Sequence, residues 1–205
     1  GDVMNVTRTE EQAREMADMA VTLGKEHNVP QHLAMARIIH SWALMADGST
    51  VDGLEEMDQG LSQYRATGAK IRRSYYLSLL AEGCIVAEEF GRGLQALEEA
   101  EAISGQIGER WWLAEVHRLR GETLMAAGGD SAAAEDCFQQ ALRVSGEQQA
   151  RSLELRASTS LARLWAAGGR RAEAKALLAP VHGGFGEGFD TADLTRAKDL
   201  LDDLP

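Results

Sequence analysis

Residues 121–141, GETLMAAGGDSAAAEDCFQQA, contain two patterns that recur along the chain. The first half starts at Gly121 and ends at a glycine turn, Gly128-Gly129. Asp130 follows, and a glycine turn before an aspartate is typical of one helix ending and another beginning. The second half has a small, a large and a small residue at helical spacing: Ala134, Phe138 and Ala141. Because small residues let two helices approach and a large one fills the space between them, this stretch predicts a helical hairpin.

The triplet of small, large and small residues occurs four times. The triplets are Gly53, Met57, Gly60; Gly93, Leu97, Ala100; Ala134, Phe138, Ala141; and Ala174, Leu178, Val181. Their central residues are 40, 41 and 40 positions apart. Glycine breaks precede the triplets at Gly48, Gly91, Gly129 and Gly169, and the helix before each break has a small residue at Ser41, Gly83, Gly121 and Ala162. Neither helix of such a hairpin can bury its apolar side alone, so we expect an all-α fold of stacked hairpins with a period of about 40 residues.

The expected helices cover residues 9–27, 30–46, 50–66, 69–90, 92–107, 110–127, 130–146, 149–167, 170–182 and 191–203. They form one domain over residues 1–205, with hairpin repeats over 30–66, 69–107, 110–147 and 149–182. The helix over 9–27 precedes the repeats. The helix over 191–203 is expected to cap them, because four apolar residues share one of its faces: Leu194, Ala197, Leu201 and Leu204.

The charge of the chain limits its partners. The 205 residues include 21 Lys and Arg against 32 Asp and Glu, a net charge of −11. Phosphate binding needs a basic surface, so we expect neither nucleic acid nor a membrane as a direct partner. Cys84 and Cys137 lie far apart in helix-like segments without metal-binding spacing, which favours a reducing, cytoplasmic location.

No sequence motif favours catalysis. A phosphate loop of the G-x-x-x-x-G-K-[ST] type is absent, and no two of the five histidines have the i, i+4 spacing of a helical metal pair. The glycine-rich run over residues 183–188 could form a phosphate cradle or a flexible link, and its position after a helix favours the link. We therefore expect no cofactor, no metal and no enzymatic activity in this chain.

Three segments resemble a known group of proteins. They are residues 108–122 (GERWWLAEVHRLRGE), 152–165 (SLELRASTSLARLW) and 177–194 (LLAPVHGGFGEGFDTADL). Together they look like the C-terminal end of bacterial multidomain signalling proteins. In those proteins a class III adenylate/guanylate cyclase or a winged-helix regulator precedes an AAA-type (STAND) ATPase and a tetratricopeptide array. The pattern of small and large residues itself resembles tetratricopeptide repeats, which implies a right-handed α-α superhelix.

The resemblance to tetratricopeptide repeats also implies a binding groove. In such arrays, the residue after the small position of the first helix tends to face the concave groove. The equivalents here are Trp42, Cys84, Glu122 and Arg163, and three residues before the small position lie Ile38, Leu80, Arg118 and Thr159. The expected partner-binding groove therefore consists of Ile38, Trp42, Arg118, Glu122, Arg156, Thr159 and Arg163. Its arginines could clamp a carboxylate or an acidic peptide, or the face could be salt-bridged internally and bind nothing.

These observations predict a non-catalytic protein-interaction and regulatory scaffold. The resemblance implies that it is the C-terminal repeat module of a larger signalling ATPase, cyclase or transcriptional regulator. Its partner would be a protein, a peptide or the upstream domains of the same polypeptide. Two alternatives stay open: a sensor that binds a small effector in the groove, and a module for homotypic assembly, for example as a homodimer.

Overall fold

The computed structural model describes residues 29–205, so the helix expected over residues 9–27 lies outside the described residues. Residues 29–205 form helices and no strands. The helices are α2 (Pro30–Ala46), α3 (Thr50–Ala66), α4 (Arg73–Val86), α5 (Phe90–Ile107), α6 (Leu113–Ala126), α7 (Ser131–Gln148), α8 (Arg151–Ala167), α9 (Arg171–Gly183) and α10 (Ala192–Asp203). Residue contacts divide them into an N-terminal unit with α2–α5 and a C-terminal unit with α6–α10. That the two units form one repeat domain stays a prediction.

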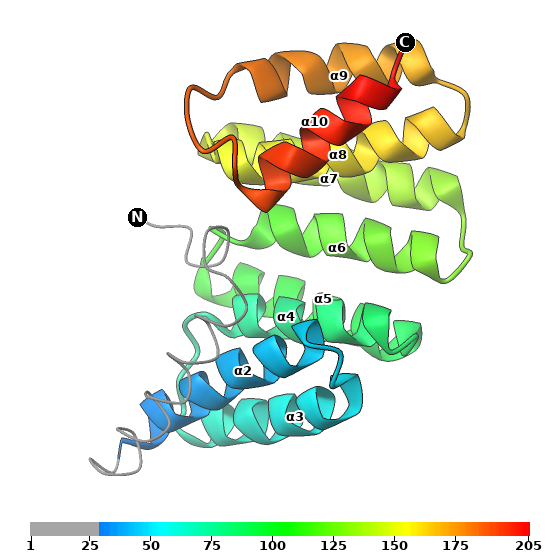
Figure 1. Ribbon diagram of the computed structural model, residues 1–205. Coiled ribbons are helices and arrows are strands. Elements are labelled where there is room, and N and C mark those ends of the chain that lie inside the picture. Colours follow the sequence, from blue (N-terminus) through cyan, green and yellow to red (C-terminus); the bar gives the residue numbers. More distant parts are fainter. Residues whose placement is uncertain (1–28) are drawn as a thin grey trace. The chain divides into compact units, whose positions relative to one another are not determined.

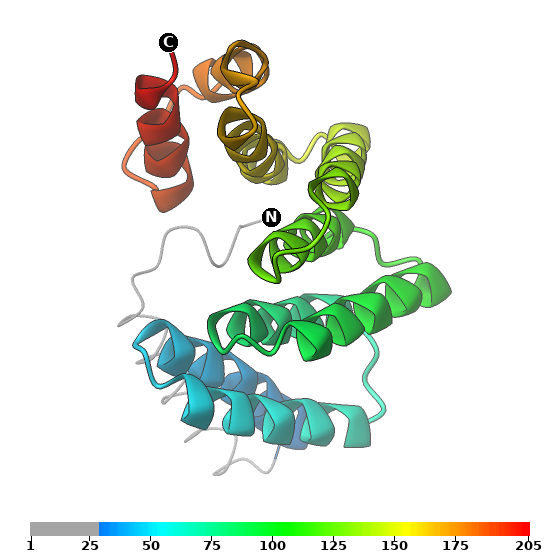
Figure 2. The same ribbon diagram turned by 90° about the vertical axis from the view of Figure 1, so that its right-hand side faces the viewer.

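Each unit is a stack of helical hairpins (Figure 1). In the N-terminal unit, α2 packs on α3 and α4 packs on α5, while α4 also contacts both helices of the first hairpin. In the C-terminal unit, α6 packs on α7 and α8 on α9, and α8 contacts both α6 and α7. The last helix, α10, lies against α8 and α9 (Figure 2). The all-α hairpin-repeat fold predicted from the sequence is confirmed.

The triplets of small and large residues form the interior of the hairpins. All their members are buried except Val181, which is half-buried. A Cβ atom added at Gly121 would lie 2.5 Å from the Phe138 ring, and one at Gly60 would lie 2.8 Å from the Ile38 side chain. Real carbon atoms do not approach so closely, so these two glycines allow the paired helices to touch.

The turn within each hairpin contains one residue in the left-handed backbone region. These residues are Gly48, Glu88, Gly128 and Gly169, with φ angles of 91°, 59°, 69° and 84°. They are 40, 40 and 41 positions apart, which matches the repeat period. The prediction that Gly91 marks the second break is therefore wrong, because Gly91 lies inside α5 and the non-glycine residue Glu88 makes the turn.

Two helices begin three or more residues later than the sequence predicts. The helix expected from residue 69 begins at Arg73, because Arg72 has a left-handed φ of 66°. The Glu109 carboxylate accepts hydrogen bonds from the Arg72 backbone N–H at 2.8 and 3.0 Å, which stabilises this turn. The helix expected from residue 110 begins at Leu113, because Trp111 and Trp112 form a turn before it.

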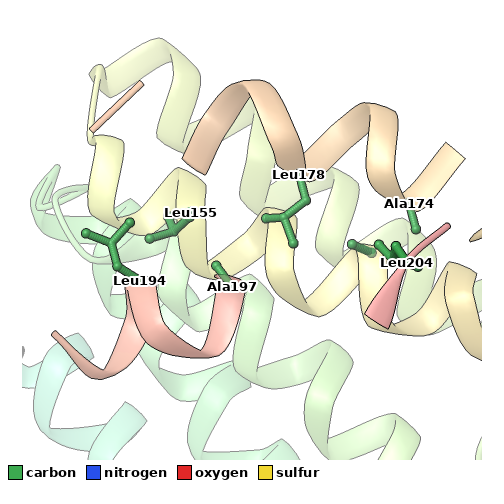
Figure 3. Packing of buried hydrophobic residues seen from close by; sticks show 7 residues of the cluster. Leu155, Ala174, Leu178, Leu194, Ala197 and Leu204 are labelled. Atoms are coloured by element: carbon green, nitrogen blue, oxygen red, sulfur yellow. The ribbon is translucent and has the colours of Figure 1, made fainter. Parts of the chain in front are cut away.

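The last helix covers the apolar side of the final hairpin. Figure 3 shows the resulting cluster, whose labelled residues come from α8, α9, α10 and the position directly after α10: Leu155, Ala174, Leu178, Leu194, Ala197 and Leu204. The glycine-rich run connects α9 to α10. Within it, the Gly184 carbonyl accepts a hydrogen bond from Arg151, and the Arg151 guanidinium lies 5.3 Å from the centre of the Phe185 ring. These contacts hold the glycine-rich run against α8, as expected for a connecting segment rather than for a phosphate-binding loop.

Candidate partner-binding surface

The left-handed turns define the register of the first helices more accurately than the glycine breaks do. Seven residues before each turn lies a small, buried residue: Ser41, Ala81, Gly121 and Ala162. Ala81 therefore replaces Gly83 as the small position of the second repeat. The residues that follow these positions are Trp42, Glu82, Glu122 and Arg163. Glu82, rather than Cys84, is thus the repeat equivalent of Trp42.

In the N-terminal unit, the corrected register brings Trp42 and Glu82 together. The indole Nε1 of Trp42 donates a hydrogen bond to Glu82 Oε2 at 3.0 Å, which links α2 to α4. Ile38 does not belong to an accessible groove. Its side chain is 0% exposed and points to Gly60 on α3, so the expectation that Ile38 contacts a partner is wrong. Cys84 is also buried, and burial raises the pKa of its thiol to about 11.

In the C-terminal unit, α6 and α8 bring together five of the expected residues: Arg118, Glu122, Arg156, Thr159 and Arg163. Arg163 Nη2 donates to both oxygens of Glu122 at 2.6 Å. Arg118 Nη1 lies 3.3 Å from Glu122 Oε1, and Ser160 donates its hydroxyl to the same oxygen. These bonds connect the two helices at the positions two repeats after Trp42 and Glu82.

The most buried charge of this surface is Glu115, whose side chain is 1% exposed. Arg118 donates to it through Nη2 at 2.7 Å and through Nε at 3.0 Å, and Arg156 Nη2 lies 2.8 Å from Glu115 Oε1. Burial alone would raise the pKa of the Glu115 carboxyl, but the charges of Arg118 and Arg156 outweigh burial and lower the pKa. The carboxylate is therefore held in its ionised form, as expected for a buried acid between two guanidinium groups.

The cap extends this arrangement by a third helix. Asp193 of α10 lies 3.9 Å from Arg156 Nε, and Arg196 Nη2 lies 3.1 Å from the other Asp193 oxygen. We call the surface that results the α6–α8–α10 face. It consists of Glu115, Arg118, Glu122, Arg156, Thr159, Arg163, Asp193 and Arg196.

Four polar residues of these two surfaces were not predicted from the sequence: Glu82, Glu115, Asp193 and Arg196. Two of them could have been found from the repeat. Glu82 is 40 residues after Trp42, and Glu115 is 41 residues before Arg156, so each occupies the same helical position as its partner. No comparable signal exists for Asp193 and Arg196, because α10 lies outside the four hairpins.

Residues 29–205 contain no group of three or more His, Cys, Asp or Glu side chains that could hold a metal ion. None of the helices in this part of the chain is both long and apolar enough to cross a membrane. A cavity of about 360 Å³ lies between α8 and the end of α9, lined by Arg151, Glu154, Pro180, Val181 and Phe185. Arg151 is already engaged with Gly184 and Phe185, and the lining offers no acid–base pair beside a nucleophile.

Comparisons with known proteins define the fold. Two crystal structures of nearly identical TPR-like repeats, from a Podosopora anserina protein described as a kinesin light chain, superpose with TM-scores of 0.62 and 0.60. They are 19% and 18% identical to this chain and cover 85% of it, which corresponds to 85% and 86% of their own chains. This chain has a TPR-like repeat fold. At such low identity the likeness concerns the fold alone.

Sequence comparisons add one relative. No model of a known protein family matches the chain. An uncharacterised protein of Rhizobium meliloti (strain 1021) is 28% identical over 156 residues, which make up 76% of this chain. The matched segment spans only 15% of that relative, so sequence similar to this chain occurs there within a much longer polypeptide.

Proposed function

We infer that this chain is a non-catalytic protein-interaction and regulatory scaffold, and that the α6–α8–α10 face is the surface it uses. The observation that carries this proposal is the concentration of charged side chains on α6, α8 and α10. A solenoid exposes the same side of each first helix in turn, so such a surface can contact an extended partner over several repeats. Charged groups on it would select the partner rather than supply most of the affinity.

A charge-reversal pair tests this proposal. Arg163 on the α6–α8–α10 face and Arg143 on α7 have similarly exposed side chains, at 60% and 64%, and each forms an ion pair with one glutamate. We expect Arg163→Glu to remove a specific partner from the tagged protein isolated from source cells, measured by quantitative mass spectrometry. Arg143→Glu is the control and should retain it. If every associated protein is retained by both variants, or lost equally from both, the assignment is wrong.

The wider context is also part of the proposal. We infer that the chain is the C-terminal repeat module of a longer cytoplasmic signalling protein with an ATPase, a cyclase or a transcription-regulator domain. The resemblance of residues 108–194 supports this, and so does the small share of the Rhizobium meliloti relative that the match covers. An antibody against the chain should detect a band far above 22.2 kDa in source-cell lysate. A single band at that mass would contradict the proposal and indicate a free-standing adaptor.

A further inference from the structure

The two most exposed charges of the α6–α8–α10 face are both positive. Its three carboxylates are recessed, with Glu115 at 1%, Asp193 at 12% and Glu122 at 19% exposure. Two of its guanidinium groups stand out from the surface instead, Arg163 at 60% and Arg196 at 68%. A ligand that approaches this face therefore meets positive charge first, although acids and bases are nearly equal in number.

The two exposed arginines keep hydrogen-bond donors for a ligand. Both bonds from Arg163 to Glu122 use the same nitrogen, Nη2, so its Nη1 and Nε groups remain available within residues 29–205. Arg196 uses Nη2 for Asp193 and Nε for the Ala192 carbonyl, which leaves Nη1 in the same part of the chain. Guanidinium groups with spare donors are the preferred ligands of carboxylates.

The charge of the surrounding unit also permits an acidic ligand. Residues 110–205 contain 12 Lys and Arg against 14 Asp and Glu, a net charge of −2, whereas the whole chain carries −11. The remaining −9 belongs to residues 1–109. Long-range repulsion of an acidic segment is consequently much weaker in the C-terminal unit than the total charge implies.

We propose that the α6–α8–α10 face binds an extended acidic segment of a partner protein, with Arg163 and Arg196 each pairing with one carboxylate. This rests on the proposed function and specifies its partner. The Arg196 guanidinium binds Asp193, which lies beside Arg156, and Arg163 follows Arg156 by seven residues on α8. Seven residues of α-helix rise by about 10.5 Å, which sets the separation between the Arg196 and Arg163 ends of the face. An extended peptide advances about 3.3 Å per residue, so acidic residues three positions apart fit this separation.

The test uses a defined probe and the whole chain. A fluorescein-labelled peptide with Glu at its first, fourth and seventh residues and Ala between them is titrated with protein, and fluorescence anisotropy is recorded. We expect binding at low ionic strength that weakens as salt is added. The double variant Arg163→Ala/Arg196→Ala should bind at least about tenfold more weakly. The control Arg143→Ala/Lys198→Ala removes two exposed cations that pair with acids on their own helices, and should bind like the unmodified chain.

A third variant should act in the opposite direction. Glu122→Gln removes the internal competitor for Arg163 and should tighten peptide binding several-fold, a result that a loss of folding cannot produce. The proposal fails if the Glu peptide binds no better than the same peptide with Gln, or if a single-stranded oligonucleotide binds preferentially. If Arg163→Glu removes a cellular partner while the Glu peptide does not bind, the acidic segment is wrong and the scaffold function stands. If the peptide behaves as expected but no partner is lost, the scaffold assignment is wrong.

Discussion

Replacing Glu115 by glutamine tests whether the buried ion pairs stabilise the C-terminal unit. Glu115→Gln keeps the size of the side chain and removes the charge that Arg118 and Arg156 surround. Removing one partner of a buried ion pair typically costs about 3–5 kcal/mol. Arg118 keeps Glu122, Arg156 keeps the more distant Asp193, and both arginines reach some solvent. We therefore expect the lower end of that range, about 3 kcal/mol.

The assay is urea unfolding of the whole chain in a Trp42→Phe background. The remaining tryptophans, Trp111, Trp112 and Trp165, all lie in the C-terminal unit, so their fluorescence reports on that unit. The control is Glu147→Gln, because Glu147 is about half exposed and pairs with two exposed arginines. An exposed pair contributes about 0–1 kcal/mol, so the control should barely change the free energy of unfolding. A loss below about 1 kcal/mol for Glu115→Gln would refute the reasoning.

The pH dependence gives the same prediction an independent check. The folded structure lowers the pKa of Glu115 below its ordinary value of 4.5, so the unfolded chain binds a proton at higher pH than the folded chain does. The stabilisation is complete above that ordinary pKa and is lost as the pH falls through the lower, folded pKa. The difference in unfolding free energy between the unmodified chain and Glu115→Gln should be constant from pH 8 to pH 6 and shrink below about pH 4. An undiminished difference at pH 3 would show that its origin is not the carboxylate charge.

Three further predictions concern the repeat and its cysteines. Glu88→Gly should stabilise the N-terminal unit by about 1 kcal/mol in urea unfolding, because glycine adopts the left-handed turn without strain; a destabilised variant would contradict the turn assignment. Gly121→Ala should destabilise the C-terminal unit by about 1–3 kcal/mol through overpacking, whereas Gly146→Ala, where a Cβ meets nothing within 4 Å, should stabilise it by about 0.5–1 kcal/mol. Equal effects of these two alanines would disprove the close approach of α6 and α7. A thiol reagent at pH 8 should modify Cys137 and leave Cys84 unmodified until the chain unfolds, since burial raises the pKa of Cys84 to about 11; mass spectrometry of the labelled peptides decides.

The hairpins were predictable because their signal is local and repeated. Met57, Leu97, Phe138 and Leu178 recur at one spacing, and each is almost fully buried between the helices of its hairpin. The same regularity would have given the correct register of the second repeat. The predicted second turn was placed at Gly91 instead of Glu88. A left-handed residue other than glycine leaves no mark in the sequence, so Glu88 could not be recognised as the turn residue.

The residues of the α6–α8–α10 face were predictable only in part. Arg118, Glu122 and Arg163 follow from the repeat, and in the structure both arginines form ion pairs with Glu122. Their mutual pairing and the burial of Glu115 depend on how far apart α6 and α8 lie, which no local pattern encodes. The prediction that Ile38 contacts a partner was wrong because of packing between helices. Gly60 leaves a space on α3, and the Ile38 side chain fills it.

Site-specific photo-crosslinking in source cells tests most directly whether the α6–α8–α10 face contacts a partner. A photoreactive amino acid replaces half-buried Thr159, between Arg156 and Arg163 on α8, or, as the control position, Gln140, an exposed residue of α7. We expect one dominant crosslinked protein from position 159, little product from position 140, and loss of the first product when Arg163→Glu is added. Equal product from both positions, or a product from position 159 that survives Arg163→Glu, would contradict this expectation.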